Sequence, residues 1–396
     1  MSVKTTLALI ILVDLAFLLF GVHTLSISYK EATILFEERS FLHYLVEFST
    51  QVFGQNDYAL RAPFILLHLL SIVLMYEISK FFLKRDADRV LSVLVFILLP
   101  GIVSSALLVN SASVVIFFTL LFIYLFLRKK ENAYSLLLPL LLLVDNSFII
   151  LYLSLVAYGV YAKNRYILIF SSVLFLVALY MYGFAVGGKP KGYFLDTFAA
   201  YSLIFSPLLF LYFFYTMYRI LVREKKSILW VISFSALMIS ILLSFRQRIM
   251  IEDFAPFVVV SIPLMVQVFV RSYRTRLPEL RRIHNVTFVI VFSFLLLNFY
   301  ATYFNQYFYR FFEAPNKHFA YKYHVAYELA QNLHAQEIDN VHCEDKQMQL
   351  RLRFYKVQEG ESYKVEKNDT YHDSDSVTIS YMNYPVISYN VSKLNK

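Results

Sequence analysis

Cysteine, glycine, proline and charged residues are all scarce in this chain of 396 residues. The single cysteine, Cys343, excludes an intrachain disulfide and a cysteine-based metal cluster. Charged residues make up only 16% of the chain, whereas a soluble domain carries about a quarter. The chain is therefore not an ordinary soluble protein, and any domain that it exports folds without disulfides.

Motifs for nucleotide, zinc or serine-hydrolase chemistry are also missing. No GxxxxGK[ST], HExxH, paired CxxC or GxSxG stands in a supporting context. The five histidines from His318 to His372 lack metal-ligand spacing. We therefore expect no cofactor and no metal site. A divalent cation at Glu252 and Asp253 stays open as an alternative, although two adjacent carboxylates without further ligands are weak support for one.

Long apolar stretches dominate the chain between Leu7 and Phe304, and hydrophobic residues make up 59% of the whole. A helix rising about 1.5 Å per residue crosses about 30 Å of hydrocarbon with stretches of about this length, 17 to 24 residues. Lipid offers the backbone no hydrogen-bond partners, so only helices or a closed barrel span it, and these stretches are too continuous for barrel strands. The sequence predicts an all-α polytopic membrane bundle. Its eleven expected spans lie near residues 5–27, 60–82, 90–109, 112–128, 133–145, 147–163, 166–186, 199–222, 228–246, 255–271 and 286–304.

The positive charge of the chain lies in this hydrophobic part. Of 37 basic and 28 acidic residues, 11 and 12 lie from Phe304 onward, so the remaining 26 and 16 lie before it. The basic residues cluster beside alternate span ends, which is typical of cytoplasmic loops. With eleven spans, this pattern predicts a cytoplasmic N-terminus and a C-terminus on the outer side. The first span has no small-residue cleavage site and is expected to remain as an anchor.

Charges return after Phe304, and the pattern there changes to short amphipathic segments. We predict a transmembrane domain over residues 1–304 and a small extracytoplasmic α/β or α+β domain over 305–396. The expected elements of the small domain are a helix near 321–333, a strand near 340–343, a helix or strand near 347–357, and alternating segments at 377–381 and 386–391.

Charged groups are few in the connections expected on the outer face, where the nearby bilayer penalises ionised side chains. They fall in the loop over residues 28–59, in a turn at Asp145, and in the loops over 187–197 and 246–253. Within the first of these loops, Ser40 is suited to cap an amphipathic helix that ends near Gly54. We expect this helix to lie flat on the membrane surface.

Several short segments of the first outer loop and the next span occur in a recognisable order. They are Tyr29-Lys30-Glu31-Ala32, the surface helix with His43-Tyr44, Phe53-Gly54-Gln55-Asn56 and Leu60-Arg61-Ala62-Pro63-Phe64. In this order they resemble the GT-C superfamily of glycosyltransferases, more specifically the family-39-like type that includes protein mannosyltransferases and aminoarabinose transferases. The motif resemblance covers residues 29–100. The chain departs from the family at Lys30, where an acidic residue is often present, and at Phe41, where proline is usual.

The resemblance implies an inverting transferase that moves a sugar from a polyprenyl phosphate to an exported lipid, glycan or protein. It also implies the outer face of a bacterial inner membrane as the place of reaction. Such a transfer needs a base for the proton of the acceptor and cations for the departing phosphate. The predicted base is Glu31. The predicted phosphate ligands are Arg246 and Arg248, with Lys189 and Lys191 as second choices.

Four further residues are candidates for substrate binding: His43, Tyr44, Arg61 and Asp145. Arg61 has the alternative of pairing with a carboxylate or a lipid headgroup at the start of its helix. Asp145 has the alternative of satisfying a tight turn beside Asn146.

The catalytic residues have alternatives too. Glu31 has that of a solvated loop carboxylate, with Glu37 and Glu38 as competitors for the role of base. Arg246 and Arg248 have the alternative role of binding lipid headgroups at the membrane surface. Lys189 and Lys191 stand in a glycine-bearing loop that also suits a plain flexible connector.

Two other functions stay open from the sequence. One is a multi-pass transporter or lipid-handling protein. Against it stand the few glycines and prolines, 9 and 10 in number, and the absence of a repeated half. The other is an inactive GT-C-like partner of another enzyme, which the missing paired acid at Lys30 would suit.

Overall fold

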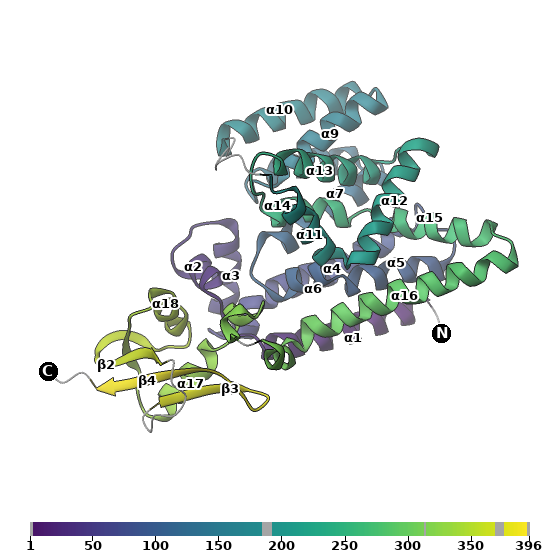
Figure 1. Cartoon of the computed structure of the whole chain (residues 1–396). Helices are drawn as coiled ribbons and strands as arrows, with labels where there is room; N and C mark the ends of the chain where they lie inside the picture. Colours follow the sequence, from purple (N-terminus) through teal and green to yellow (C-terminus); the bar gives the residue numbers. More distant parts are fainter. Residues whose placement is uncertain (1–2, 184–191, 313, 369–375, 394–396) are drawn as a thin grey trace. The chain divides into compact units, whose positions relative to one another are not determined.

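The computed structural model describes residues 3–183, 192–312, 314–368 and 376–393 (Figure 1). The described chain divides into two compact units. The first consists of Met1–Leu15, Phe64–Ala106 and Asn110–Phe299, and the second of Ala16–Pro63, Leu107–Val109 and Tyr300–Lys396. The C-terminal segment thus belongs to one unit with residues 28–59, the predicted first outer loop.

Apolar helices make up the first unit. Their bounds are α1 (Val3–His23), α4 (Asp57–Ser79), α5 (Asp86–Leu98), α6 (Pro100–Leu107), α7 (Ser111–Leu127), α8 (Glu131–Leu141), α9 (Phe148–Ala162), α10 (Arg165–Tyr182), α11 (Phe194–Phe205), α12 (Pro207–Arg223), α13 (Ile228–Ser244), α14 (Ile251–Val259), α15 (Ile262–Thr275) and α16 (Pro278–Tyr303). Four of these helices also contribute residues to the second unit: α1 from Ala16 onward, α4 up to Pro63, α6 at Leu107 and α16 from Tyr300 onward. The helices enclose a continuous apolar core that includes Phe96, Leu120, Phe148 and Phe210.

Four of these helices, α1, α4, α10 and α16, are long and apolar enough to cross a membrane by themselves. Three bent pairs also qualify by length and composition, which raises the number to seven. Three shorter apolar helices, α7, α9 and α13, have 17, 15 and 17 residues. The predicted helical membrane bundle is therefore confirmed, although several of the eleven expected spans are bent or short.

Proline explains two of the sharpest bends. The span expected near 199–222 is broken by 104° between α11 and α12, where Ser206 has a φ of 73° before Pro207. The span expected near 90–109 is bent by 62° at Leu99, an extended residue before Pro100. Proline lacks an N–H and disfavours the helical conformation of the residue before it, so each helix stops there.

A buried acid and a buried histidine of the helical unit pair with each other. The carboxylate of Asp14 on α1 lies 2.8 Å from Nε2 of His68 on α4, and both side chains are buried. The imidazole of His68 also stacks on Phe96 of α5. An isolated acid would be costly within an apolar span, and this pair removes that cost.

Short helices and one sheet make up the second unit. The helices are α2 (Tyr29–Phe36), α3 (Phe41–Phe53), α17 (Ala326–Ala335) and α18 (Lys346–Phe354), with 3-10 turns at Asn305–Phe311, Pro315–Lys317 and Tyr321–Tyr323. The strands are β1 (Asn340–Cys343), β2 (Gln358–Asn368), β3 (Ser376–Tyr381) and β4 (Tyr384–Lys393). The sheet order is β1-β2-β4-β3, with β1 and β2 parallel and the other pairs antiparallel. The small mixed domain predicted at the C-terminus is confirmed.

The helix expected after Ser40 is also present. The Ser40 hydroxyl accepts a hydrogen bond from the backbone N–H of His43 at 3.3 Å, and α3 ends at Phe53 before Gly54, which has a φ of 83°. One face of α3 is apolar and exposed, with Phe48 at 68%. An amphipathic helix of this kind suits a membrane surface.

Strand β2 has no counterpart among the sequence-based predictions. Its eleven residues carry glutamate, lysine and glutamine at most positions, and only Val365 is fully buried. The apolar alternation that indicates a strand is therefore missing. The strand forms because β1 and β4 satisfy its backbone on both sides.

Candidate active site

A fully buried arginine, Arg61 on α4, forms the centre of a polar cluster in the second unit. Its Nη1 donates to the carbonyl of Leu25 at 3.1 Å and to Oδ1 of Asp57 at 3.0 Å. Its Nη2 donates to the carbonyl of Ser26 at 3.1 Å and lies 3.5 Å from Oε2 of Glu31. The guanidinium thus faces two carboxylates and two carbonyls, and the pairing proposed as the alternative for Arg61 is present.

Glu31, the predicted base, is tied to the backbone at both carboxylate oxygens. Its Oε2 accepts from the N–H of Ser28 at 2.8 Å, and its Oε1 accepts from the N–H of Val109 at 3.0 Å. The Ser28 hydroxyl in turn accepts from the N–H of Glu31, which completes a capping box at the start of α2. Glu31 is 1% exposed, so a proton acceptor role requires that a substrate hydroxyl reach a closely surrounded carboxylate.

A second carboxylate of the cluster, Asp57, is more accessible. Its side chain is 15% exposed, whereas that of Glu31 is 2% exposed. The hydroxyl of Tyr355 lies 3.0 Å from both carboxylate oxygens of Asp57 and accepts from the N–H of Ile27 at 2.9 Å. Burial and the neighbouring carboxylate raise the pKa of Tyr355 well above 10, so it keeps its proton and donates to Asp57.

Arg351 on α18 holds the same segment of backbone. Its Nε donates to the carbonyl of Ile27 at 2.7 Å, and its Nη2 donates to the Ser26 hydroxyl at 3.2 Å and to the carbonyl of His324 at 2.6 Å. Sequence reasoning missed both Arg351 and Tyr355. The signal that was present is their i, i+4 spacing, which puts them on one face of a helix.

His43 and Tyr44 on α3 make other contacts. Nδ1 of His43 lies 3.1 Å from the carbonyl of Ile34, and its Nε2 lies 3.3 Å from the carboxylate of Glu47. Tyr44 is 58% exposed. The hydrogen bonds and ion pairs found for the described residues do not join either side chain to Arg61, so any role of His43 and Tyr44 in substrate binding is separate from this cluster.

In the first unit, Arg248 lines a cavity of about 470 Å³. The polar lining comes from Asn146, Ser147, Gln247, Arg248 and Asp253, and the rest is almost wholly apolar. Across the residues with described coordinates, no carboxylate lies within ion-pair distance of Arg248. A cation at the edge of an apolar cavity suits a phosphate that carries a hydrocarbon chain.

Asp145 stabilises the turn beside this cavity. Its Oδ1 accepts from the N–H of Ser147 at 2.8 Å, and the Ser147 hydroxyl donates to Oδ1 of Asp253 at 3.2 Å. The turn interpretation of Asp145 therefore has direct structural support. Arg246 is exposed and is not among the residues that line the cavity. Lys189 and Lys191 lie outside the described residues.

Within the described part of the chain, no group of three or more histidine, cysteine, aspartate or glutamate side chains stands close enough to hold a metal ion. Glu252 and Asp253, the adjacent pair noted in the sequence, both lie in the first turn of α14. Among the described residues, these two carboxylates are not part of a group of three such side chains.

Two solved structures align with almost the whole chain. The crystal structure of ArnT from Cupriavidus metallidurans in the apo state aligns with a TM-score of 0.55 and 12% identity, over 98% of each chain. The structure of the same protein bound to undecaprenyl phosphate aligns with a TM-score of 0.57 and 10% identity, over 99% of each chain. The chain has the ArnT fold. No family model matches the sequence, and no curated protein matches it.

This likeness confirms the fold class predicted from the sequence. The ArnT fold extends over both the helical bundle and the small C-terminal domain, since hardly any residue of either chain is left uncovered. At 10–12% identity the comparison carries the fold and not the identity of individual site residues.

Proposed function

We propose that this protein is a membrane glycosyltransferase that takes a sugar from a polyprenyl-phosphate donor. The observation that carries the proposal is the ArnT fold over the whole chain, together with a solved ArnT that binds undecaprenyl phosphate. The GT-C-like order of segments from Tyr29 to Phe64 supports it independently. The acceptor is an exported lipid, glycan or protein, and the reaction takes place on the outer face of the bacterial inner membrane.

The proposed step is a single displacement with inversion. The acceptor oxygen forms a bond to the anomeric carbon while the bond from that carbon to the phosphate oxygen breaks, and polyprenyl phosphate leaves with the electron pair. A carboxylate takes the acceptor proton. Glu31 is the proposed base, and Asp57 is the second candidate because its side chain is the more exposed of the two.

Arg248 is the proposed ligand of the donor phosphate. Its cavity combines an arginine without an acidic partner among the described residues and apolar walls that suit the first isoprene units. Arg246, in the same connection between helices, is the next candidate, and Lys189 and Lys191 remain second choices. A fixed cation stabilises the negative charge that develops on the leaving phosphate oxygen.

The decisive experiment supplies purified protein with a series of radiolabelled polyprenyl-phosphate sugars and a membrane extract as acceptor. Donor hydrolysis or transfer of label supports the transferase, provided that Glu31→Gln and Arg248→Gln reduce it. Accumulation of label inside proteoliposomes without loss of sugar from the lipid would instead indicate a transporter. Inertness toward every donor would indicate a non-catalytic partner protein.

A further inference from the structure

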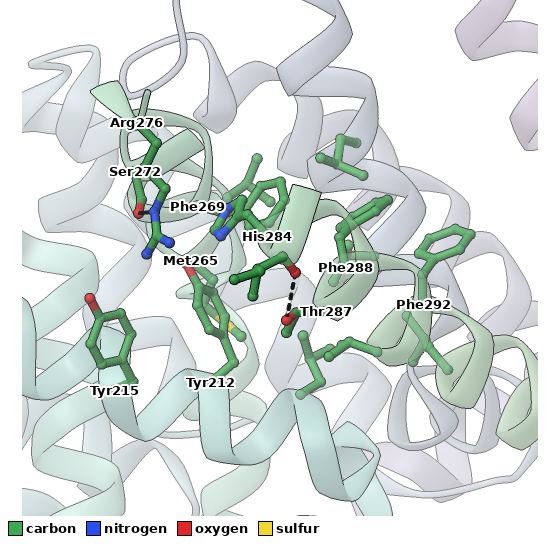
Figure 2. Close-up of a pocket in the computed structure, with 17 residues that line it drawn as sticks. Tyr212, Tyr215, Met265, Phe269, Ser272, Arg276, His284, Thr287, Phe288 and Phe292 are labelled. Atoms are coloured by element: carbon green, nitrogen blue, oxygen red, sulfur yellow. Dashed lines mark hydrogen bonds between the residues drawn. The ribbon is translucent and has the colours of Figure 1, made fainter. Parts of the chain in front are cut away.

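An apolar cavity of about 390 Å³ lies between α5, α12, α15 and α16 (Figure 2). Leucine, valine, methionine and phenylalanine side chains form most of its lining, and its size falls in the range of ligand pockets. Helix α16 forms one wall of the cavity. Only 11% of its apolar membrane-spanning stretch is buried inside the protein. The cavity is therefore bounded by a helix whose outer surface is available to lipid.

Polar groups gather at one end of this cavity. Arg276, Ser272 and His284 lie together there, whereas Phe288 and Phe292 lie farther along the cavity (Figure 2). The ring of His284 stacks on Phe269 at 4.6 Å, and its buried Nε2 has no hydrogen-bond partner among the residues that the structure describes. A buried ring nitrogen without a partner is costly, and an additional polar group in the cavity would satisfy it.

Arg276 differs from its neighbours in its pairing. Arg271 donates to a carboxylate oxygen of Glu224 at 3.0 Å, and Arg274 donates to both carboxylate oxygens of Asp88 at 2.8 Å. Arg276 donates only from Nε to the Ser272 hydroxyl, at 3.3 Å, among the described residues. Its two terminal nitrogens thus remain available at the end of the apolar cavity.

The surrounding segment is strongly basic. Residues 271–282 contain five arginines and one acid, Glu279. Fixed positive charge beside an apolar cavity complements a ligand with a negative headgroup and a hydrocarbon tail. Basic pockets between membrane helices bind anionic lipid headgroups for this reason.

We propose that this cavity binds an anionic glycerophospholipid of the bilayer, with one acyl chain along Phe288, Val291 and Phe292 and the phosphate at Arg276 and His284. The guanidinium forms charge-assisted hydrogen bonds to the phosphate oxygens, and the imidazole Nε2 gains a partner there. The bound lipid acts as a structural ligand that ties α16 to α12 and α15. It is separate from the proposed sugar donor, whose phosphate is assigned to Arg248.

Lipid-dependent stabilisation of the full-length protein in detergent tests the headgroup end. Phosphatidylglycerol is expected to raise the apparent unfolding temperature of the wild type by on the order of 3 °C, whereas phosphatidylcholine has a much smaller effect. Arg276→Gln is expected to lose this shift and to bind the lipid about tenfold more weakly. Arg282→Gln is the matched control, since Arg282 is an exposed residue of the same basic segment, on α16, and does not line the cavity. Equal shifts for both variants would overturn the proposal.

A second pair of variants tests the acyl-chain end without altering charge. Val291→Trp fills the cavity and is expected to abolish the rise in unfolding temperature that phosphatidylglycerol causes. Val289 is 59% exposed and does not line the cavity, so Val289→Trp is expected to keep this rise. A short polyprenyl phosphate without sugar forms the last arm. Stabilisation by that compound through Arg276, with none by phosphatidylglycerol, would refute the assignment. If Arg276→Gln does not fold, Arg276→Lys and the valine pair still decide the question.

Discussion

Two arginines show how differently the two units use a guanidinium. Arg61 in the second unit is fully buried and faces Asp57, Glu31 and two backbone carbonyls. Arg248 in the first unit lines a cavity and has no acidic partner among the described residues. A cation that is saturated by its own protein fixes structure, whereas one that is left open at a cavity is available to an anionic ligand. This difference separates the role of Arg61 in positioning the backbone around Ser26 from the proposed role of Arg248 in binding the donor phosphate.

The carboxylate beside Arg61 provides the largest expected effect. Glu31→Gln removes the proposed base and is expected to lower sugar transfer on the order of a thousandfold. Transfer rates measured with labelled donor test this, with Glu37→Gln, a change to an exposed neighbour, as the control. Full transfer by Glu31→Gln together with a loss in Asp57→Asn would move the role of base to Asp57.

Removal of the Arg61 guanidinium is expected to reduce the stability of the protein more than its rate of sugar transfer. Arg61→Gln leaves two carboxylates without their common partner, at a cost of about 3 kcal/mol. Unfolding in detergent measures this cost, and Arg39→Gln, at an exposed residue between α2 and α3, provides the comparison. Unchanged stability in Arg61→Gln would mean that the cluster is not a structural centre.

Removal of the Arg248 guanidinium is expected to weaken donor binding and to leave stability unchanged. Arg248→Gln is expected to weaken donor binding about thirtyfold, because a charge-assisted contact with phosphate contributes about 2 kcal/mol. The unfolding temperature is expected to stay unchanged. Arg246→Gln, outside the cavity, is the matched control, and an equal loss in both variants would favour headgroup anchoring over donor binding.

The smallest effect concerns a buried histidine of the second unit. Burial, aided by the nearby His318 and Arg351, lowers the pKa of His324 to about 3. Below a pH of about 6.5 the unfolded chain takes up a proton that the folded chain refuses, so stability is full above that pH and falls as the pH is lowered.

Acidification from pH 7 to 5.5 is therefore expected to cost about 1 kcal/mol at this residue. Unfolding curves recorded over this range test it. His324→Gln is expected to reduce the dependence of stability on pH, whereas His342→Gln, at an exposed position, is expected to keep it. A dependence that is unaltered in His324→Gln would assign the acid sensitivity to another group.

Local sequence predicted the elements whose residues carry their own signals. Ser40 marked the start of α3, and the apolar stretches marked the membrane helices. The helix expected near 321–333 begins later, at Ala326, because Val325 has a φ of 83°. Polar β2 and the sharp bend at Ser206 depend on neighbours in space or on proline, and no periodicity indicated them.

The candidate site was predictable only in part for the same reason. The pairing of Arg61 followed from its position at a helix start. Tyr355 and Asp57 are separated by 298 residues in the chain, so nothing local in the sequence indicates their contact. The capping box of Glu31 is visible in the sequence as a serine, Ser28, followed three residues later by glutamate, whereas the resemblance to transferases indicates a catalytic role for the same glutamate.

The most direct test of the account is transfer of labelled sugar from a polyprenyl phosphate by the purified wild-type protein. We expect that label leaves the donor and appears in an exported acceptor, and that Arg248→Gln slows this step without loss of folded protein. Donor that stays intact for every sugar offered, with folded wild-type protein and acceptor present, would contradict it.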